Sequence, residues 1–203
     1  MNATHTHYPD FANPELLEKI PLSARTILDV GCAQGALGAD YLRRNPRARV
    51  LGIDVDPEAI SHAQGRISEA VCADVEKTPM PFAVPEGIDC IIYGDVLEHL
   101  RDPWRVMRQH ADLLSPRGIM LICVPNIGYW QVALRLISGT FDYEDQGVLD
   151  RTHFRWFTLA SMEKALGETG LQTCDVMPRI FDRAQAEAAA DMLKPVLDAM
   201  GIT

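Results

Sequence analysis

Residues 26–38 read TILDVGCAQGALG, an apolar run that ends at Val30 and is followed by three glycines. A short run rich in Ile and Val that is bounded by glycine is typical of a buried strand. Gly31 and Gly35 allow positive φ and close backbone approach, and the N-terminus of a following helix favours a ligand's negative group. The stretch therefore predicts a ligand-binding turn between a strand and a helix.

The rest of the chain repeats this alternation of strand and helix. We expect strands at 25–30, 48–55, 70–75, 88–96 and 118–125, with a last one near 171–178. We expect helices at 35–46, 56–68, 103–114, 159–170 and 182–200, the last interrupted at Pro195. This order predicts an α/β fold with an open, doubly wound, Rossmann-like sheet, whose ligands bind at the carboxyl ends of the strands.

The length of 203 residues suits one domain. We divide it into an N-terminal helical extension (1–22), a substrate-side insert (126–158) and a C-terminal helix (182–203), all around a single sheet domain spanning 1–203.

Composition excludes several classes of partner and location. The net charge of −9 argues against binding to duplex nucleic acid, so an anionic partner would need a local basic patch. No apolar run reaches the roughly 20 residues of a membrane helix, and the first residues lack the pattern of a signal peptide. We therefore expect a cytoplasmic protein without membrane insertion. The five cysteines form no C-x-x-C pair, which speaks against disulfides and zinc.

Acids at three successive strand ends distinguish between nucleotide ligands. Asp29 stands beside the first turn, where it would repel a dinucleotide's pyrophosphate but attract the ammonium of S-adenosylmethionine (SAM). The spacing G-x-A-x-G at 31–35 also differs from the G-x-G-x-x-G of dinucleotide sites. Asp54 could accept both ribose hydroxyls, and Asp74 the adenine amino group, with the Val75 N–H beside it. Any one such aspartate alone would more often be a turn former or helix cap.

The chain resembles the class I SAM-dependent methyltransferases from about residue 26 to about residue 171. The likeness is specific in the first turn and in GIDVD, ADVE and GDVLEHL. It implies a seven-stranded sheet whose last strand is antiparallel, with SAM as cofactor. Ala33 departs from the glycine of many members, and a methyl group there is tolerable if φ is negative. The cofactor-binding residues that we assign are Asp29, Gly31, Cys32, Ala33, Gly35, Asp54, Val55, Asp74, Val75, Gly94 and Asp95.

Within this family three branches stay open. GDVLEHL resembles the ubiquinone-biosynthesis O-methyltransferase type, and the stretch from VPNIGYW to RTHFRWFT resembles bacterial enzymes associated with cell-surface polysaccharide synthesis. A looser likeness links the same region to MetW of methionine biosynthesis, which is understood mainly as a partner of an acyltransferase. We therefore expect O-methylation of a small polar acceptor such as a saccharide or sugar nucleotide. The alternative is a MetW-like interaction partner without essential turnover.

Asp95, Glu98 and His99 allow two interpretations. Similar residues are implicated in divalent metal binding in ubiquinone-type relatives. Alternatively, Asp95 as N-cap and Glu98 three residues later would form a capping box at the start of a helix. We favour the cap and assign no metal. His99 could still face the ligand as a base.

The stretch LDRTHFRWFT (149–158) supplies the remaining candidates. If it is extended, Arg151, His153 and Arg155 lie on one side and the aromatic residues on the other, which is a substrate wall or an ordinary solvated edge strand. The arginines would keep His153 neutral, so we favour His153 over His99 as the base and an anionic acceptor as substrate. Tyr129 and Trp130, with Arg151 and Arg155, are the candidate substrate-binding residues, although core packing is the default for Trp130. The other histidines (His5, His7, His62 and His110) are expected on the surface.

Overall fold

A computed structural model describes residues 10–179 and 183–201 of the chain. His5 and His7 lie outside these residues. The described residues divide into two compact units, the first running to Pro125 and including Thr152–Phe157, and the second formed by Asn126–Arg151 and the residues from Thr158 on. The prediction of a single domain over 1–203 stays a prediction.

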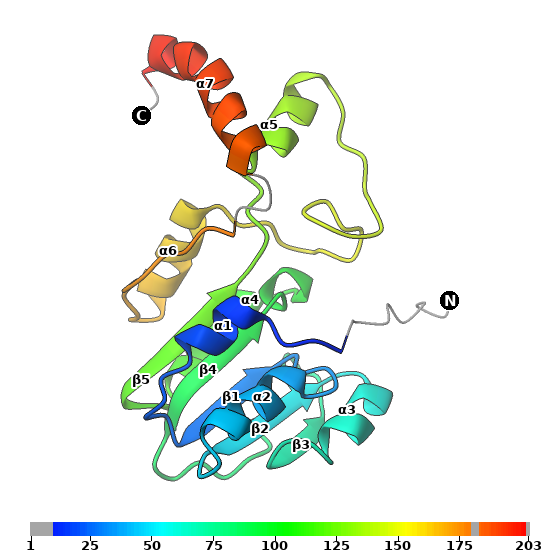
Figure 1. Ribbon diagram of the computed structural model, residues 1–203, viewed down its shortest axis with the longest axis vertical. Helices are drawn as coiled ribbons and strands as arrows, with labels where there is room; N and C mark the ends of the chain where they lie inside the picture. Colours follow the sequence, from blue (N-terminus) through cyan, green and yellow to red (C-terminus); the bar gives the residue numbers. More distant parts are fainter. Residues whose placement is uncertain (1–9, 180–182, 202–203) are drawn as a thin grey trace. The chain divides into compact units, whose positions relative to one another are not determined.

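The first unit is a five-stranded parallel sheet in the order β3-β2-β1-β4-β5 (Figure 1). The strands are β1 (Thr26–Val30), β2 (Arg49–Asp54), β3 (Glu69–Cys72), β4 (Ile88–Gly94) and β5 (Leu114–Cys123). The helices are α1 (Pro14–Lys19), α2 (Ala36–Arg44), α3 (Pro57–Ala63), the 3-10 turn η1 (Leu97–His99) and α4 (Pro103–Ala111). The α/β architecture and the first five predicted strands are thus confirmed.

Side-chain alternation along the strands gives the sheet a core on each face. On one face, Ile27 of β1 packs in a cluster with Leu16 of α1 and Tyr41 of α2. Figure 1 shows α1 and α2 lying on the same side of the strands. On the other face, the hydroxyl of Tyr93 and Nδ1 of His110 share a 2.6 Å hydrogen bond that ties β4 to α4. The carboxyl ends of β1, β2 and β4 therefore meet at one edge with rigid support from both faces.

The expectation of seven strands with an antiparallel last one is wrong for this structure. All pairings found among the described residues of the sheet are parallel. The run at 171–178 forms no strand, and its Val176 and Met177 are about half exposed. This run is short, carries Asp175 and ends at Pro178, so it offers little apolar surface to a neighbouring strand.

The second unit contains α5 (Trp130–Ile137), α6 (Leu159–Glu168) and α7 (Arg183–Met200). Helix α5 falls inside the insert and was not predicted. Thr158 caps α6 through a reciprocal pair with Ser161. The predicted interruption at Pro195 is wrong, because α7 continues through this residue. A proline removes one backbone donor from a helix, and the remaining bonds of this 18-residue helix continue on both sides.

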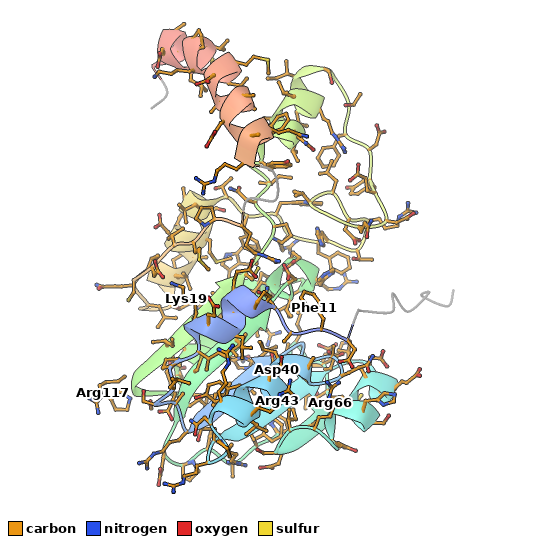
Figure 2. All side chains as sticks on the ribbon, in the orientation of Figure 1. Phe11, Lys19, Asp40, Arg43, Arg66 and Arg117 are labelled. Atoms are coloured by element: carbon orange, nitrogen blue, oxygen red, sulfur yellow. The ribbon has the colours of Figure 1, made fainter. Side chains whose placement is uncertain are left out.

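Arg66 connects the first turn to the residues before α1. Nη1 of Arg66, labelled in Figure 2, lies 2.6 Å from a carboxylate oxygen of Asp10 and donates to the carbonyl of Gln34 at 3.1 Å. The turn is thus held from the side of α3 as well as by the sheet. None of the helices in the described residues has the length and apolar character needed to cross a membrane.

Candidate functional site

The turn after β1 adopts backbone conformations that its glycines make possible. φ is +74° at Gly31 and +77° at Gly35, both in the left-handed region. The amides of Gly31 and Cys32 donate to the carbonyl of Ile53 at 2.7 and 3.1 Å. A Cβ added at Gly31 would lie 2.3 Å from Cγ2 of Val96, so this position requires glycine for space as well as for φ.

Ala33 does not have the negative φ that we expected. Its φ is +46°, and this left-handed conformation is energetically unfavourable for a residue with a Cβ. The amide of Ala33 donates to Oδ2 of Asp54 at 2.8 Å, and this charge-assisted bond compensates the strain. The left-handed conformation thus holds the turn against the end of β2.

The carboxylate of Asp54, at the end of β2, binds the turn that follows β1. Its Oδ2 accepts the Ala33 amide, and its Oδ1 accepts the amide of Asp56 at 2.9 Å. A carboxylate oxygen can accept more than one hydrogen bond, so both oxygens retain capacity for ligand hydroxyls. The neighbouring Val55 is 67% exposed, which leaves an apolar side chain at the same edge.

Asp74 follows β3 in a turn of its own. Its Oδ1 accepts the Glu76 amide at 2.9 Å, and its Oδ2 lies 2.7 Å from the ammonium of Lys77. The hydrogen bond from Lys77 lowers the pKa of Asp74, so the carboxylate is ionised at neutral pH. Val75 is half-buried beside it.

The capping box predicted at Asp95 and Glu98 is wrong. Asp95 has a φ of +57° and donates its amide to the carbonyl of Cys123, which places it in the turn that follows Gly94 and β4. The helical turn η1 begins only at Leu97, with Val96 as N-cap and no side-chain cap hydrogen bond. Asp95 therefore belongs to the strand-end turn, and Glu98 lies inside η1.

Glu98, His99 and His153 come together in the first unit. The rings of the two histidines meet edge to face with centroids 4.8 Å apart. One potential ligand atom from each of the three residues lies within 4.8 Å of the others. Glu98 and His153 are 2% and 7% exposed. The structure therefore joins the two histidines that the sequence offered as alternatives, and the three side chains could also hold a divalent cation.

Backbone contacts fix His153 beside Glu98. The amides of Phe154 and Arg155 both donate to the carbonyl of Glu98, at 2.8 and 3.0 Å. The hydroxyl of Thr152 lies 3.2 Å from Nδ1 of His99. Thr152 was missed in the sequence, although it directly precedes a candidate base.

The predicted alternation of charged and apolar sides in 149–158 is wrong. A turn occupies 151–152, and His153 is buried whereas Phe154 is 46% exposed. The Arg155 guanidinium lies 5.5 Å from the centre of the Trp104 ring and donates to the carbonyl of Arg101. Arg155 therefore has a packing role in this structure.

The remaining substrate candidates belong to the second unit. Tyr129 is 39% exposed and meets Trp130 edge to face at 5.6 Å between ring centroids. Arg151 pairs with Asp145 at 2.7 Å across an exposed turn. Their assignment to substrate binding stays a prediction.

Comparison with known proteins shows the family to which this chain belongs. Residues 6–176 match the family model described as a methyltransferase domain. The ubiquinone biosynthesis O-methyltransferase of Azorhizobium caulinodans is 28% identical over 179 residues, covering 84% of this chain and 69% of that protein. The trans-aconitate 2-methyltransferase of Escherichia coli is 28% identical over 66% of this chain, which spans 53% of the enzyme.

A solved structure supports the fold. The plantazolicin methyltransferase BpumL in complex with SAH aligns with a TM-score of 0.57 and 23% identity, covering 76% of this chain and 58% of that one. The chain thus spans between about half and about two thirds of the length of these relatives.

Proposed function

This chain belongs to the methyltransferase family whose domain it matches, with SAM as its cofactor. We propose that it transfers a methyl group from SAM to a hydroxyl of a small polar acceptor. A saccharide or sugar nucleotide is the acceptor class that we favour. When bound, SAM supplies an electrophilic methyl group on its sulfonium. The protein then has to align the acceptor oxygen for in-line attack and to remove its proton.

The strand ends of the first unit fit the cofactor. Asp54 keeps hydrogen-bonding capacity on both oxygens for the ribose hydroxyls, while the turn at Gly31 brings backbone close without a side chain. Asp74 and the Val75 amide would receive the adenine, and Asp29 the ammonium of the methionine part. Gly35 precedes the first residue of α2, where the helix N-terminus favours the cofactor's carboxylate.

The observation that carries O-methylation is the pairing of His153 with His99. Methylation of a hydroxyl releases a proton, and histidine is the side chain whose ordinary pKa lies nearest to neutral pH. The backbone amides of the two residues after His153 donate to the carbonyl of Glu98, and the buried His153 ring packs edge to face on that of His99. We propose His153 as the general base. His99 is then the neighbouring ring that packs against it.

An anionic acceptor remains our preference. Arg151 is an exposed guanidinium in a chain of net charge −9, and we propose that an anionic acceptor replaces its ion-pair partner, the exposed Asp145. The trans-aconitate enzyme acts, by its name, on a carboxylate-bearing compound. Arg155 supports this less than we expected from sequence, since its guanidinium already contacts Trp104 and the Arg101 carbonyl.

Methyl transfer to a panel of acceptors tests the proposal. The protein is incubated with labelled SAM and with nucleotide sugars, sugar phosphates, carboxylic acids and neutral phenols. We expect turnover on an anionic hydroxyl compound, and a fall in kcat on the order of a hundredfold in His153→Ala with SAM binding retained. His62→Ala, an exposed histidine on α3, is the matched control.

Three other outcomes would change the assignment. Loss of turnover in a folded His99→Ala protein, with His153→Ala active, would make His99 the base. Binding of SAH without turnover on any acceptor would favour the MetW-like role. Loss of activity with a chelator, restored by a divalent cation, would mean that Glu98, His99 and His153 hold a metal that polarises the hydroxyl.

A further inference from the structure

Glu76 joins the turn after β3 to the start of α4. It lies two residues after Asp74, in the turn at 74–78, which we call the adenine loop because it is proposed to receive the adenine. Oε2 of Glu76 accepts the backbone amide of Arg101 at 3.1 Å, and Oε1 accepts that of Asp102 at 2.7 Å. The carbonyl of Glu76 accepts Nη2 of Arg105 at 2.8 Å. The adenine loop is therefore fastened to the chain between η1 and α4 through backbone and side chain.

The same part of the chain holds the base segment, Thr152–Phe157. The amides of Phe154 and Arg155 donate to one carbonyl of η1 at 2.8 and 3.0 Å, and the Arg155 guanidinium donates to the carbonyl of Arg101. Two arginine–aromatic contacts cross between the same two stretches. The guanidinium of Arg101 lies 4.9 Å from the centre of the Phe154 ring, and that of Arg155 lies 5.5 Å from the centre of the Trp104 ring. These contacts fix the position of the base segment.

Together the contacts form a continuous path inside the first unit. The path runs from the adenine loop through the Glu76 carboxylate to the amide of Arg101, and from the carbonyl of Arg101 through Arg155 to the base segment. Arg101 thus binds one partner at each end of its own backbone. Chains of hydrogen-bonded and packed groups of this kind carry coupling between sites, and a measured coupling is what establishes it.

Stabilisation of α4 is a separate effect of Glu76, because its carboxylate lies at the N-terminus of that helix. Asp102 shares this effect, since it is the N-cap of α4 and accepts the Arg105 amide at 3.1 Å. The hydrogen bond and the ion pair of the Asp102 side chain both go to Arg105. Loss of either carboxylate weakens the helix start, but loss of the Glu76 carboxylate also breaks the path.

We propose that Glu76 is a positioning residue that transmits the binding of the cofactor's adenine to the base segment. This inference rests on the proposed function, which places the adenine at Asp74 and Val75 and assigns His153 as the base. Bound adenine orders the adenine loop, and Glu76 then holds the Arg101 amide more firmly, so that the base segment opens less often. The base is therefore best aligned for the acceptor's proton when the methyl donor is in place.

Hydrogen exchange of the Phe154 amide measures this coupling. The amide donates to the Glu98 carbonyl, so its exchange reports opening of the base segment. The exchange is followed by NMR on the full chain, with and without saturating S-adenosylhomocysteine (SAH). We expect SAH to slow it about tenfold in the wild type, within the roughly 5- to 150-fold range of coupling between two sites.

Glu76→Ala should bind SAH but lose this effect. Its affinity should stay within about threefold of the wild type, because the closed form of the base segment predominates in both proteins. The slowing by SAH should fall below about twofold, since bound adenine no longer acts on the Arg101 amide. Glu76→Gln keeps one acceptor oxygen and should recover part of the slowing.

Two further variants test the path. Asp102→Ala is the matched control, which should speed exchange through a weaker helix start yet retain about tenfold slowing by SAH. Arg155→Ala breaks the path at its other end and should lose the slowing as Glu76→Ala does. Because both variants interrupt one path, the double variant should lose no more of it than either alone.

The outcomes separate this inference from the proposed function. Unchanged exchange of the Phe154 amide in wild type saturated with SAH would overturn the inference and leave the methyltransferase proposal intact. Slowing that persists in Glu76→Ala, or an equal loss in Asp102→Ala, would also overturn it. Failure of the wild type to bind SAH would contradict the proposed function, and the inference with it. If Glu76→Ala does not fold, Glu76→Gln and Arg155→Ala interrupt the path in its place.

Discussion

At the scale of single residues, Asp54 has two functions that one substitution should reveal together. Asp54→Ala removes the proposed acceptor of both ribose hydroxyls, each charge-assisted bond contributing roughly 1.5–3 kcal/mol. It also releases the Ala33 amide and thus the left-handed turn. We expect SAH affinity to fall at least about tenfold, which corresponds to 1.4 kcal/mol, in a calorimetric titration.

Asp56→Ala is the matched control for this prediction. Asp56 caps α3 in the same loop by accepting the amides of Glu58 and Ala59. Its loss should cost about 1 kcal/mol of stability and leave SAH affinity nearly unchanged. If the two variants lost affinity equally, disturbance of the loop, and not the ribose contact, would explain the effect of Asp54.

At the scale of elements, the turn between β1 and α2 depends on Gly31 for two separable reasons. An alanine there would adopt an unfavourable positive φ, at a cost of roughly 1–2 kcal/mol, and its Cβ would overlap Val96. We expect Gly31→Ala to lower the urea midpoint of unfolding by more than Gly139→Ala. Gly139 has a φ of +81° but nothing within 4 Å of an added Cβ, so it pays for the conformation alone.

A double variant separates the two costs. Gly31→Ala combined with Val96→Ala removes Cγ2 of Val96 and should recover the steric part of the loss, measured against Val96→Ala alone. No recovery would show that backbone conformation dominates at this turn.

The elements differ in how well the local sequence predicts them. The strand and turn at 26–38 were predictable because both the apolar period and the need for positive φ are local properties. The strand expected at 171–178 failed because strand formation depends on a partner that local sequence does not encode. The cap at Asp95 failed because the Asp95 amide bonds to Cys123, a residue far along the chain.

The site residues also divide into those that local sequence predicts and those that depend on distant parts of the chain. The gathering of the acids at the strand ends was predictable because parallel strands bring their carboxyl ends to one edge. The approach of the segment at Thr152 and His153 to His99 was not predictable, since His99 and Thr152 are 53 positions apart in the sequence. The burial of His110 was missed although a signal existed. Pro103, Val106, Met107 and His110 recur at helical spacing, which indicates one buried face.

At the scale of the whole molecule, His110 should give the folded state a specific sensitivity to acid. It is 6% exposed, and burial lowers its pKa from 6.5 to about 4. Between these values the unfolded chain binds a proton that the folded chain does not. The contribution is therefore fully present above pH 6.5 and is lost as pH falls towards 4, up to about 3 kcal/mol.

Urea unfolding at a series of pH values measures this contribution. The free energy of unfolding of the wild type should fall between pH 6.5 and 4 more steeply than that of His110→Asn. His62→Asn, which alters an exposed histidine, should follow the wild type. Parallel curves for wild type and His110→Asn would show that the buried Tyr93–His110 pair does not govern acid sensitivity.

The segment Thr152–Phe157 has a consequence for how such an enzyme could be diversified. It returns to the first unit between two stretches of the second, and it is fastened there by its own bonds to Glu98 and by the contact of Arg155 with Trp104. Residues 126–151 thus form an excursion that leaves the sheet unit after Pro125 and comes back at an anchored point. Under our proposal that residues 126–151 belong to the substrate-side insert, grafting excursions of other lengths and compositions between these two points should give variants that bind the same cofactor and differ in the acceptors that they methylate.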